Sequence, residues 1–158
     1  MTEEEKIFAG KMFDPRKQEL KDIKHKAHIA CQKFNAMDEY DPQRSRVIGE
    51  ILGKTGKVYY FQGPVQFNYG CHTFIGENFF ANFNLTVMDD GPIYIGDNVC
   101  FGPNVSLMAT NHPLIANVIK LRNIEKSQIE KYGIFLLKSV DNSHDLCGRF
   151  YQILRSGR

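Results

Sequence analysis

The chain contains 158 residues, of which 42% are hydrophobic, and its formal net charge is only +2. This length predicts about one domain, and a domain of this size can bury roughly 70% of the surface of its unfolded chain. The composition disfavours a membrane protein, a disordered tail and a strongly basic nucleic-acid binder. No apolar run approaches about 20 residues, and the small net charge offers little attraction to phosphates.

Residues 1–55 are typical of a helical region. Thr2 and Glu5 have the spacing of a capping box, in which each side chain accepts a hydrogen bond from the other residue's backbone N–H. Asp14 and Asp41 each precede a proline, so each is predicted to cap a helix whose first residue is that proline.

The two helices after these aspartates are predicted to be amphipathic. Their apolar residues recur at spacings of three and four, which is typical of one buried helix face. In the helix after Asp14 these residues are Leu20, Ile23, Ala27, Ala30, Cys31 and Phe34. In the shorter helix after Asp41, which is expected to end at Gly53, they are Val47, Ile48, Ile51 and Leu52.

Residues 56–114 show a six-residue period in two registers that are two positions apart. One register contains Tyr69, Ile75, Ala81 and Val87, and the other contains Phe61, Phe67, Thr73, Phe79 and Leu85. After Asp90-Gly91 both registers resume with a shift of two residues, as Ile95, Phe101 and Leu107, and as Ile93, Val99 and Val105.

This period predicts a solenoid, in which each coil buries its inward row against the next coil. We expect a mainly β fold with N-terminal helices: an incomplete left-handed parallel β-helix with three short faces and about 18 residues per coil. The repeated corners at Gly76-Glu77-Asn78 and Gly96-Asp97-Asn98 are expected to supply the positive φ angles that tight turns need. The shift at Asp90-Gly91 is interpreted as a loop at one corner. An ordinary antiparallel sandwich is the alternative.

Residues 111–158 do not continue the period. The segment 111–114, with His112 before a proline, is expected to be an exit turn, since proline favours an extended conformation in the preceding residue. Residues 115–127 are expected to form an external loop and residues 128–158 an atypical tail. A solenoid that ended here would leave an open end, which is an aggregation liability.

The cysteines are predicted to be reduced thiols, because none lies in a CxxC pair and their spacing matches neither a zinc knuckle nor a disulfide framework. They are Cys31, Cys71, Cys100 and Cys147. The acidic N-terminus shows no apolar signal core. We therefore expect a cytoplasmic protein without a metal.

A family resemblance rests on ordered blocks: IFAGKMFDP, then FNYGCHTFIGENFFANFNLTVMDDGPIYIGDN, and then FGPNVSLMATNHPL. Over about residues 5–127 the chain resembles the maltose/galactoside O-acetyltransferase family of hexapeptide-repeat enzymes. The resemblance implies a left-handed β-helix that assembles as a homotrimer, with active sites between neighbouring subunits. It also implies that acetyl-CoA donates an acetyl group to a sugar hydroxyl.

The same resemblance implies roles for five residues. His112 would be the general base on the acceptor hydroxyl, since an imidazole with a pKa of about 6.5 can accept a proton at neutral pH. Asn82 would lie at the acceptor and the reacting acetyl group, and Asp90 and Asn68 would bind the sugar. Asp14 would close the sugar pocket. Transfer would be direct, without a serine or cysteine nucleophile, and fixed donors would stabilise the oxyanion.

Each of these residues also has a simpler interpretation. His112 could be only a loop residue, and Asn82 and the Asp90-Gly91 pair could only form turns. Asp14 could be only a helix N-cap. These alternatives involve no catalysis.

The sequence departs from the family from about Gln128 onward, where the family has further coils that line the acetyl-CoA groove and supply an oxyanion donor. A frameshifted or replaced tail would explain this abrupt loss. Two functions therefore stay open: an acetyltransferase with an impaired donor site, and a non-catalytic remnant or trimer-interaction module.

A third alternative, a γ-class-like carbonic anhydrase, would need three histidines converging on zinc. The histidine spacing does not favour such a site. His72 is expected to be exposed on a coil face, and His25 and His28 are expected on a helix flank.

Overall fold

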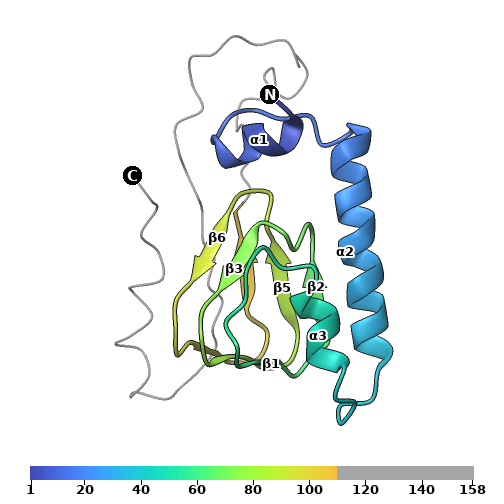
Figure 1. Ribbon diagram of the computed structural model, residues 1–158, viewed down its shortest axis with the longest axis vertical. Helices are drawn as coiled ribbons and strands as arrows, with labels where there is room; N and C mark the ends of the chain where they lie inside the picture. Colours follow the sequence, from blue (N-terminus) through green and yellow to red (C-terminus); the bar gives the residue numbers. More distant parts are fainter. Residues whose placement is uncertain (110–158) are drawn as a thin grey trace.

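The computed structural model describes residues 1–109, in which helices precede a stack of short parallel strands (Figure 1). The helices are α1 (Glu3–Phe8), α2 (Gln18–Ala36) and α3 (Arg44–Gly49). The strands are β1 (Tyr59–Phe61), β2 (Val65–Phe67), β3 (Thr73–Ile75), β4 (Phe79–Ala81), β5 (Leu85–Met88), β6 (Ile93–Ile95), β7 (Cys100–Phe101) and β8 (Ser106–Met108).

The strands form three parallel sheets with the orders β1-β4-β7, β2-β5-β8 and β3-β6. Each strand pairs with the strand 20 residues later, as in Tyr59 with Phe79 and Val65 with Leu85. The described strands therefore form a three-sided parallel β-helix, and the antiparallel alternative is wrong. The predicted coil of about 18 residues is also wrong, because the observed coil has 20.

Each coil is longer than predicted because one of its three corners contains two extra residues. Buried strand residues follow one another at six-residue steps from Ile75 to Val87, but Val87 and the equivalent Ile95 are eight residues apart. The predicted shift at Asp90-Gly91 is therefore confirmed. The same expansion also occurs one coil earlier, between β2 and β3, where the sequence pattern did not reveal it.

Aromatic side chains fill the interior of the β-helix. The rings of Phe61 and Phe79 lie 5.4 Å apart, and those of Phe79 and Phe101 lie 5.3 Å apart, so one row of rings continues through successive coils. Full burial of a phenylalanine contributes roughly 1.5–3 kcal/mol, which makes this row a principal source of stability.

The positive φ angles expected in the corners after β3 and β6 are found at asparagine. Asn78 and Asn98 have φ angles of 55° and 58°, and the Asn78 side chain donates a 2.9 Å hydrogen bond to Oδ1 of Asn98. Gly76 is needed for close approach instead, because a Cβ there would lie 2.7 Å from the carbonyl carbon of Gly96. Asparagine tolerates the left-handed conformation better than most residues.

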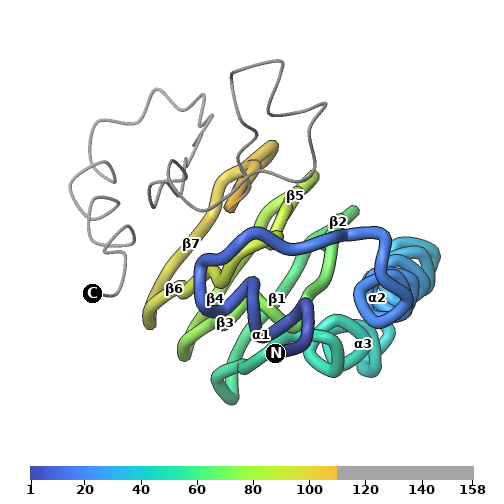
Figure 2. The backbone as a smooth tube through the Cα atoms, turned by 90° about the horizontal axis from the view of Figure 1, so that it is seen from above, coloured from blue at the N-terminus to red at the C-terminus, as the bar shows by residue number. Residues whose placement is uncertain are grey.

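The long helix α2 covers the beginning of the solenoid. It packs against α3 and β2, and Figure 2 shows α2 and α3 together beside the first coil, with β7 farther away. The predicted apolar face is confirmed: Leu20, Ala27, Cys31 and Phe34 are buried. No helix among residues 1–109 has the length and apolar character needed to cross a membrane.

The capping box at Thr2 and Glu5 is confirmed, but both proline-linked caps are wrong. Helix α2 begins three residues after Pro15, because Asp14 instead closes a turn on the backbone N–H of Arg16. Asp41 likewise accepts a hydrogen bond from the N–H of Gln43, and α3 begins only at Arg44.

The end of α3 also differs from the prediction. The helix ends at Gly49 instead of Gly53. Ile51 and Leu52 are buried in the turn that follows, and the backbone N–H of Gly53 donates to the carbonyl oxygen of Thr73. The chain has therefore already joined the solenoid at Gly53, which explains why an apolar helical pattern continued past the end of the helix.

Candidate functional site

Two of the residues implied by the family resemblance meet at the expanded corners of successive coils. Asn68 follows β2 and Asp90 follows β5, and Nδ2 of Asn68 donates a 3.1 Å hydrogen bond to Oδ2 of Asp90. Both side chains are half-buried, so the pair presents an oriented amide and a carboxylate to solvent. Such a pair can bind hydroxyl groups, because the carboxylate accepts and the amide offers both a donor and an acceptor.

Asp89, beside Asp90, holds this expanded corner together. Its fully buried carboxylate accepts hydrogen bonds from the backbone N–H of Tyr69 at 2.7 Å and from the hydroxyl of Thr73 at 2.9 Å. Burial raises the pKa of Asp89 above its ordinary value, although these hydrogen bonds act in the opposite direction. Asp89 was not predicted as a site residue, because its only signal in the sequence is its place in the Asp-Asp pair that opens the corner.

His72 is part of the same corner and is completely buried, so its predicted exposure is wrong. Its ring lies 4.7 Å from that of Tyr69 and 5.1 Å from that of Phe8. Phe8 belongs to α1, which lies across this end of the strands (Figure 1). The burial therefore depends on a contact between residues 64 positions apart, which no local pattern contains.

Asn82 lies at a different corner, between β4 and β5. Its Oδ1 accepts a hydrogen bond from the N–H of Phe83, and its own N–H donates to the carbonyl oxygen of Phe101. The four residues of β5 separate this corner from Asp90, a length of roughly 13 Å at the usual rise of a strand. A single copy of the described fold does not bring Asn82 to the Asn68–Asp90 pair.

Asp14 lies in the connection between α1 and α2. Its carboxylate forms two hydrogen bonds with the Arg16 guanidinium, at 2.8 and 2.9 Å, and its backbone N–H donates to the Glu3 carboxylate. The pKa of Glu3 is lowered first by its hydrogen bond with Lys6 and then by this backbone donor. These contacts place Asp14 in the connection that joins α1 to α2.

The remaining residues singled out in the sequence lie outside this corner or outside the described part of the chain. His112 lies outside the described residues, as do the predicted exit turn, external loop and tail. His25 and His28 are exposed on α2, as expected. Cys31, Cys71 and Cys100 are free thiols, also as expected, and Cys147 lies outside the described part.

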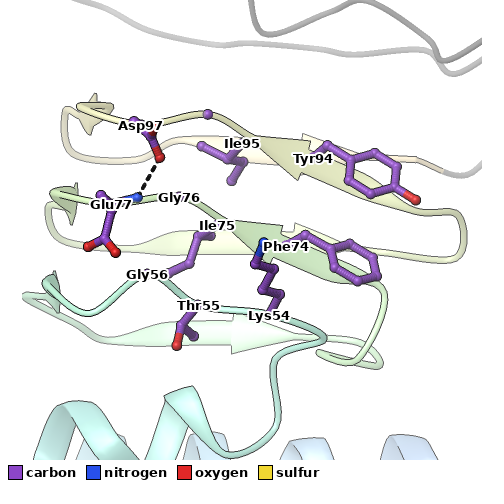
Figure 3. Close-up of a pocket in the computed structure, with 11 residues that line it drawn as sticks. Lys54, Thr55, Gly56, Phe74, Ile75, Gly76, Glu77, Tyr94, Ile95 and Asp97 are labelled. Carbon is purple, nitrogen blue, oxygen red and sulfur yellow. Dashed lines mark hydrogen bonds between the residues drawn. The ribbon is translucent and has the colours of Figure 1, made fainter.

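A shallow groove of about 420 Å³ lies elsewhere, along the face formed by β3 and β6 (Figure 3). The rings of Phe74 and Tyr94 stack 4.8 Å apart at one side of it, and Oδ1 of Asp97 accepts a hydrogen bond from the N–H of Glu77 at the other. Its lining contains none of the five residues implied by the family resemblance. We therefore place the candidate site at the expanded corners and not in this groove.

Comparisons with known proteins find related acetyltransferases. A family model described as the maltose acetyltransferase hexapeptide capping motif matches residues 6–56, which include α2 and α3. The galactoside O-acetyltransferase of Escherichia coli K12 is 38% identical over 111 residues, which are 70% of this chain and 55% of that protein.

Two solved structures share the fold. A galactoside acetyltransferase in complex with coenzyme A is 36% identical with a TM-score of 0.71, and the match covers 76% of this chain and 60% of that one. A maltose O-acetyltransferase from Clostridium difficile 630 is 31% identical, also with a TM-score of 0.71, over 74% of this chain and 63% of that one.

The chain thus spans a little over half the length of the relatives that it matches. The family model covers the helical region, and the matches to relatives extend over about 70% of this chain. Together, they show that the chain is similar to the maltose and galactoside O-acetyltransferases, which are hexapeptide-repeat proteins.

Proposed function

We propose that this protein transfers an acetyl group from acetyl-CoA to a hydroxyl group of a sugar of the maltose or galactoside type. The observation that carries the proposal is the Asn68–Asp90 hydrogen bond at the expanded corner of a fold shared with a coenzyme A-bound galactoside acetyltransferase. The winding is proposed to be left-handed and the location cytoplasmic, which the free thiols support.

The acceptor sugar is proposed to bind at the Asn68–Asp90 pair. A carboxylate accepts hydrogen bonds from sugar hydroxyls, and hydrogen bonds to an ionised acceptor are stronger than those to a neutral one. Asn68 uses one amide proton to hold Asp90 and retains a second amide proton and its carbonyl oxygen for the ligand. The pair therefore orients the sugar, and its acceptor hydroxyl must then meet a base.

The position of Asn82 supports a site that is shared between subunits. Asn82 and Asp90 lie at two different corners of one coil, with β5 between them. In a homotrimer whose axis runs along the solenoids, one corner of each copy faces a different corner of its neighbour. We propose that Asn82 of one subunit completes the site that Asn68 and Asp90 form in the next.

His112 is proposed to be the general base, on the strength of the family resemblance. It would take the proton of the sugar hydroxyl while that oxygen attacks the carbonyl carbon of the thioester. The tetrahedral intermediate would then collapse with cleavage of the C–S bond. The coenzyme A thiolate would leave and recover the proton from His112, so that the sugar ester and free coenzyme A are the products.

A second candidate is a non-catalytic member of the family that only assembles with related subunits. It is favoured by the absence of the six-residue period in residues 128–158, where relatives continue their coils in our interpretation of the sequence. The two candidates share the acceptor corner and differ in whether acetyl-CoA binds. Calorimetric titration of the purified chain with acetyl-CoA separates them.

The activity is tested by mixing the purified chain with acetyl-CoA and a panel of maltose, glucose and galactosides, and by following thiol release. We expect acceptor-dependent release that is strongly reduced in Asp90→Asn. The control His25→Asn, on an exposed part of α2, should match the wild type. Absence of thioester consumption with every acceptor would contradict the proposal and favour the non-catalytic candidate.

A further inference from the structure

Three side chains with metal-binding atoms converge where α1 meets the expanded corner between β2 and β3. They are Glu4 of α1 and the consecutive Cys71 and His72 of the corner, and their ligating atoms all lie within 4.8 Å of one another. Oε1 of Glu4 lies 3.6 Å from Sγ of Cys71 and 3.6 Å from Nε2 of His72. The cluster is separate from the Asn68–Asp90 pair and has no part in the proposed acetyl transfer.

The imidazole of His72 points an unpartnered nitrogen into this cluster. The residue is 0% exposed, and its buried Nε2 has no hydrogen-bond partner. Its Nδ1 lies 2.8 Å from the carbonyl oxygen of Asp89. Because a carbonyl oxygen only accepts hydrogen bonds, Nδ1 must carry a proton, and in the neutral ring Nε2 then offers its lone pair.

With a neutral imidazole, this arrangement is unfavourable unless a cation lies between the two groups. The Nε2 lone pair of the neutral ring faces a carboxylate oxygen at 3.6 Å, a distance too long for a hydrogen bond. Metal-binding histidines characteristically donate their other ring N–H to a carbonyl or carboxylate oxygen, as Nδ1 does here. The ring is therefore already in the tautomer and orientation that a metal ligand requires.

The spacing of the ligand atoms also suits zinc. Bonds of about 2.0–2.3 Å to oxygen, nitrogen and sulfur in a tetrahedral site place pairs of ligand atoms roughly 3.3–3.6 Å apart. Both contacts of Glu4 Oε1 are 3.6 Å, and the Cys71 and His72 ligand atoms lie within 4.8 Å of each other, so side-chain movements of about 1 Å or less would complete the site. The Glu4 side chain is 38% exposed, which leaves a path for the ion and room for a water molecule as the fourth ligand.

We propose that Glu4, Cys71 and His72 bind one zinc-class divalent ion that fixes α1 to the expanded corner. On binding, the Cys71 thiol loses its proton to solvent and the thiolate forms the bond to the metal. The ion links a residue near the N-terminus to two residues almost seventy positions later, so it stabilises the cap against the solenoid. No metal was expected from the sequence, since the three ligands are of different types and Glu4 is remote from the other two.

The Cys71 thiol lies at the edge of the cluster and is half-buried. A bound divalent ion would stabilise the thiolate through its own charge.

The test is titration of the metal-free full chain with Co²⁺, followed by competition with Zn²⁺. We expect one Co²⁺ per chain with a thiolate-to-cobalt charge-transfer band in the near ultraviolet, which Zn²⁺ abolishes. The band should be lost in Cys71→Ser and kept in the matched control Cys100→Ser, whose thiol is exposed on β7. A band that survives in Cys71→Ser, or no band in the wild type, would overturn the proposal.

Glu4→Gln provides the decisive second variant, because Glu4 is half-exposed and its replacement leaves the buried corner intact. We expect its Co²⁺ affinity to fall by at least about tenfold, while His28→Asn, on the exposed part of α2, has no effect. Circular dichroism establishes that each variant is folded. If folded Glu4→Gln binds Co²⁺ as tightly as the wild type, the proposed site is wrong.

Discussion

The corner after β3 and the corner after β5 both form a sharp turn between short strands, but different contacts stabilise them. After β3, exposed residues repeat the same contacts in the next coil, as Asn78 does with Asn98. After β5, buried polar groups make contacts that do not repeat, as Asp89 does with Tyr69 and Thr73. The regular corner propagates the solenoid, whereas the expanded corner creates a position where single side chains acquire individual roles.

This difference teaches where function can arise in a repetitive fold. A regular corner is constrained by the coils above and below it, since each residue must match its partner 20 positions away. The expanded corner has two more residues, and these allow Asp90 to face solvent while Asp89 faces the interior. Substitutions in the regular corner should therefore change only the stability of the fold, whereas substitutions in the expanded corner can also change ligand binding.

The largest effect is expected from Asp89→Ala. The substitution leaves the buried N–H of Tyr69 and the hydroxyl of Thr73 without their acceptor, and hydrogen bonds to charged groups contribute roughly 1.5–3 kcal/mol each. We expect the free energy of unfolding to fall by about 3 kcal/mol or more, measured by urea denaturation. A loss below about 1 kcal/mol would mean that the expanded corner does not depend on this carboxylate.

The next largest effect is expected from a matched pair of glycine variants in the regular corners. In Gly76→Ala the new Cβ would lie 2.7 Å from the carbonyl carbon of Gly96, so the stacked coils must move apart. Overpacking of this kind costs about 1–3 kcal/mol. In Gly96→Ala no atom of residues 1–109 outside the adjoining residues lies within 4 Å of the new Cβ, and stability should change by less than about 0.5 kcal/mol. Equal losses in both variants would contradict the close-packing role of Gly76.

Asn68→Ala should separate binding from stability at the expanded corner. Because the Asn68–Asp90 bond is half-buried, its loss should lower the free energy of unfolding by only about 0.5–1.5 kcal/mol. If the pair orients the acceptor, KM for the sugar should rise about tenfold, equivalent to about 1.4 kcal/mol, while KM for acetyl-CoA stays constant. Steady-state kinetics with each substrate varied measures both values, and an unchanged sugar KM would remove Asn68 from the acceptor site.

The repetitive part of the fold could be predicted from the sequence because its contacts recur. The buried face of α2, from Leu20 to Phe34, and the stacking of apolar strand residues followed directly from their spacing. The length of the coil could not be predicted in this way. Tyr69 is apolar and precedes Ile75 by six residues, so its spacing is the same as that of a buried strand residue. In the structure Tyr69 lies in the expanded corner, where its burial has a different cause.

The site was predictable only in part, for a related reason. The resemblance indicated Asn68 and Asp90, which the structure brings into contact, but it could not show that Asn82 lies at a different corner. The burial of His72 depends on Phe8, and the proposed metal site depends on Glu4, both from α1. These contacts join segments far apart in the sequence and occur once, so no periodic pattern records them.

The smallest difference is expected between two substitutions of Asn78, which separate backbone strain from the hydrogen bond between stacked side chains. Asn78→Ala places a residue with a Cβ at a φ of 55° and removes the hydrogen bond to Asn98, so we expect a loss of about 1–2 kcal/mol. Asn78→Gly removes the same hydrogen bond but relieves the strain, and its loss should be about 1 kcal/mol smaller. Thermal or urea unfolding of both variants measures the difference. If glycine destabilises as much as alanine, then the stacked amides, and not the left-handed backbone, determine why asparagine occupies the regular corner.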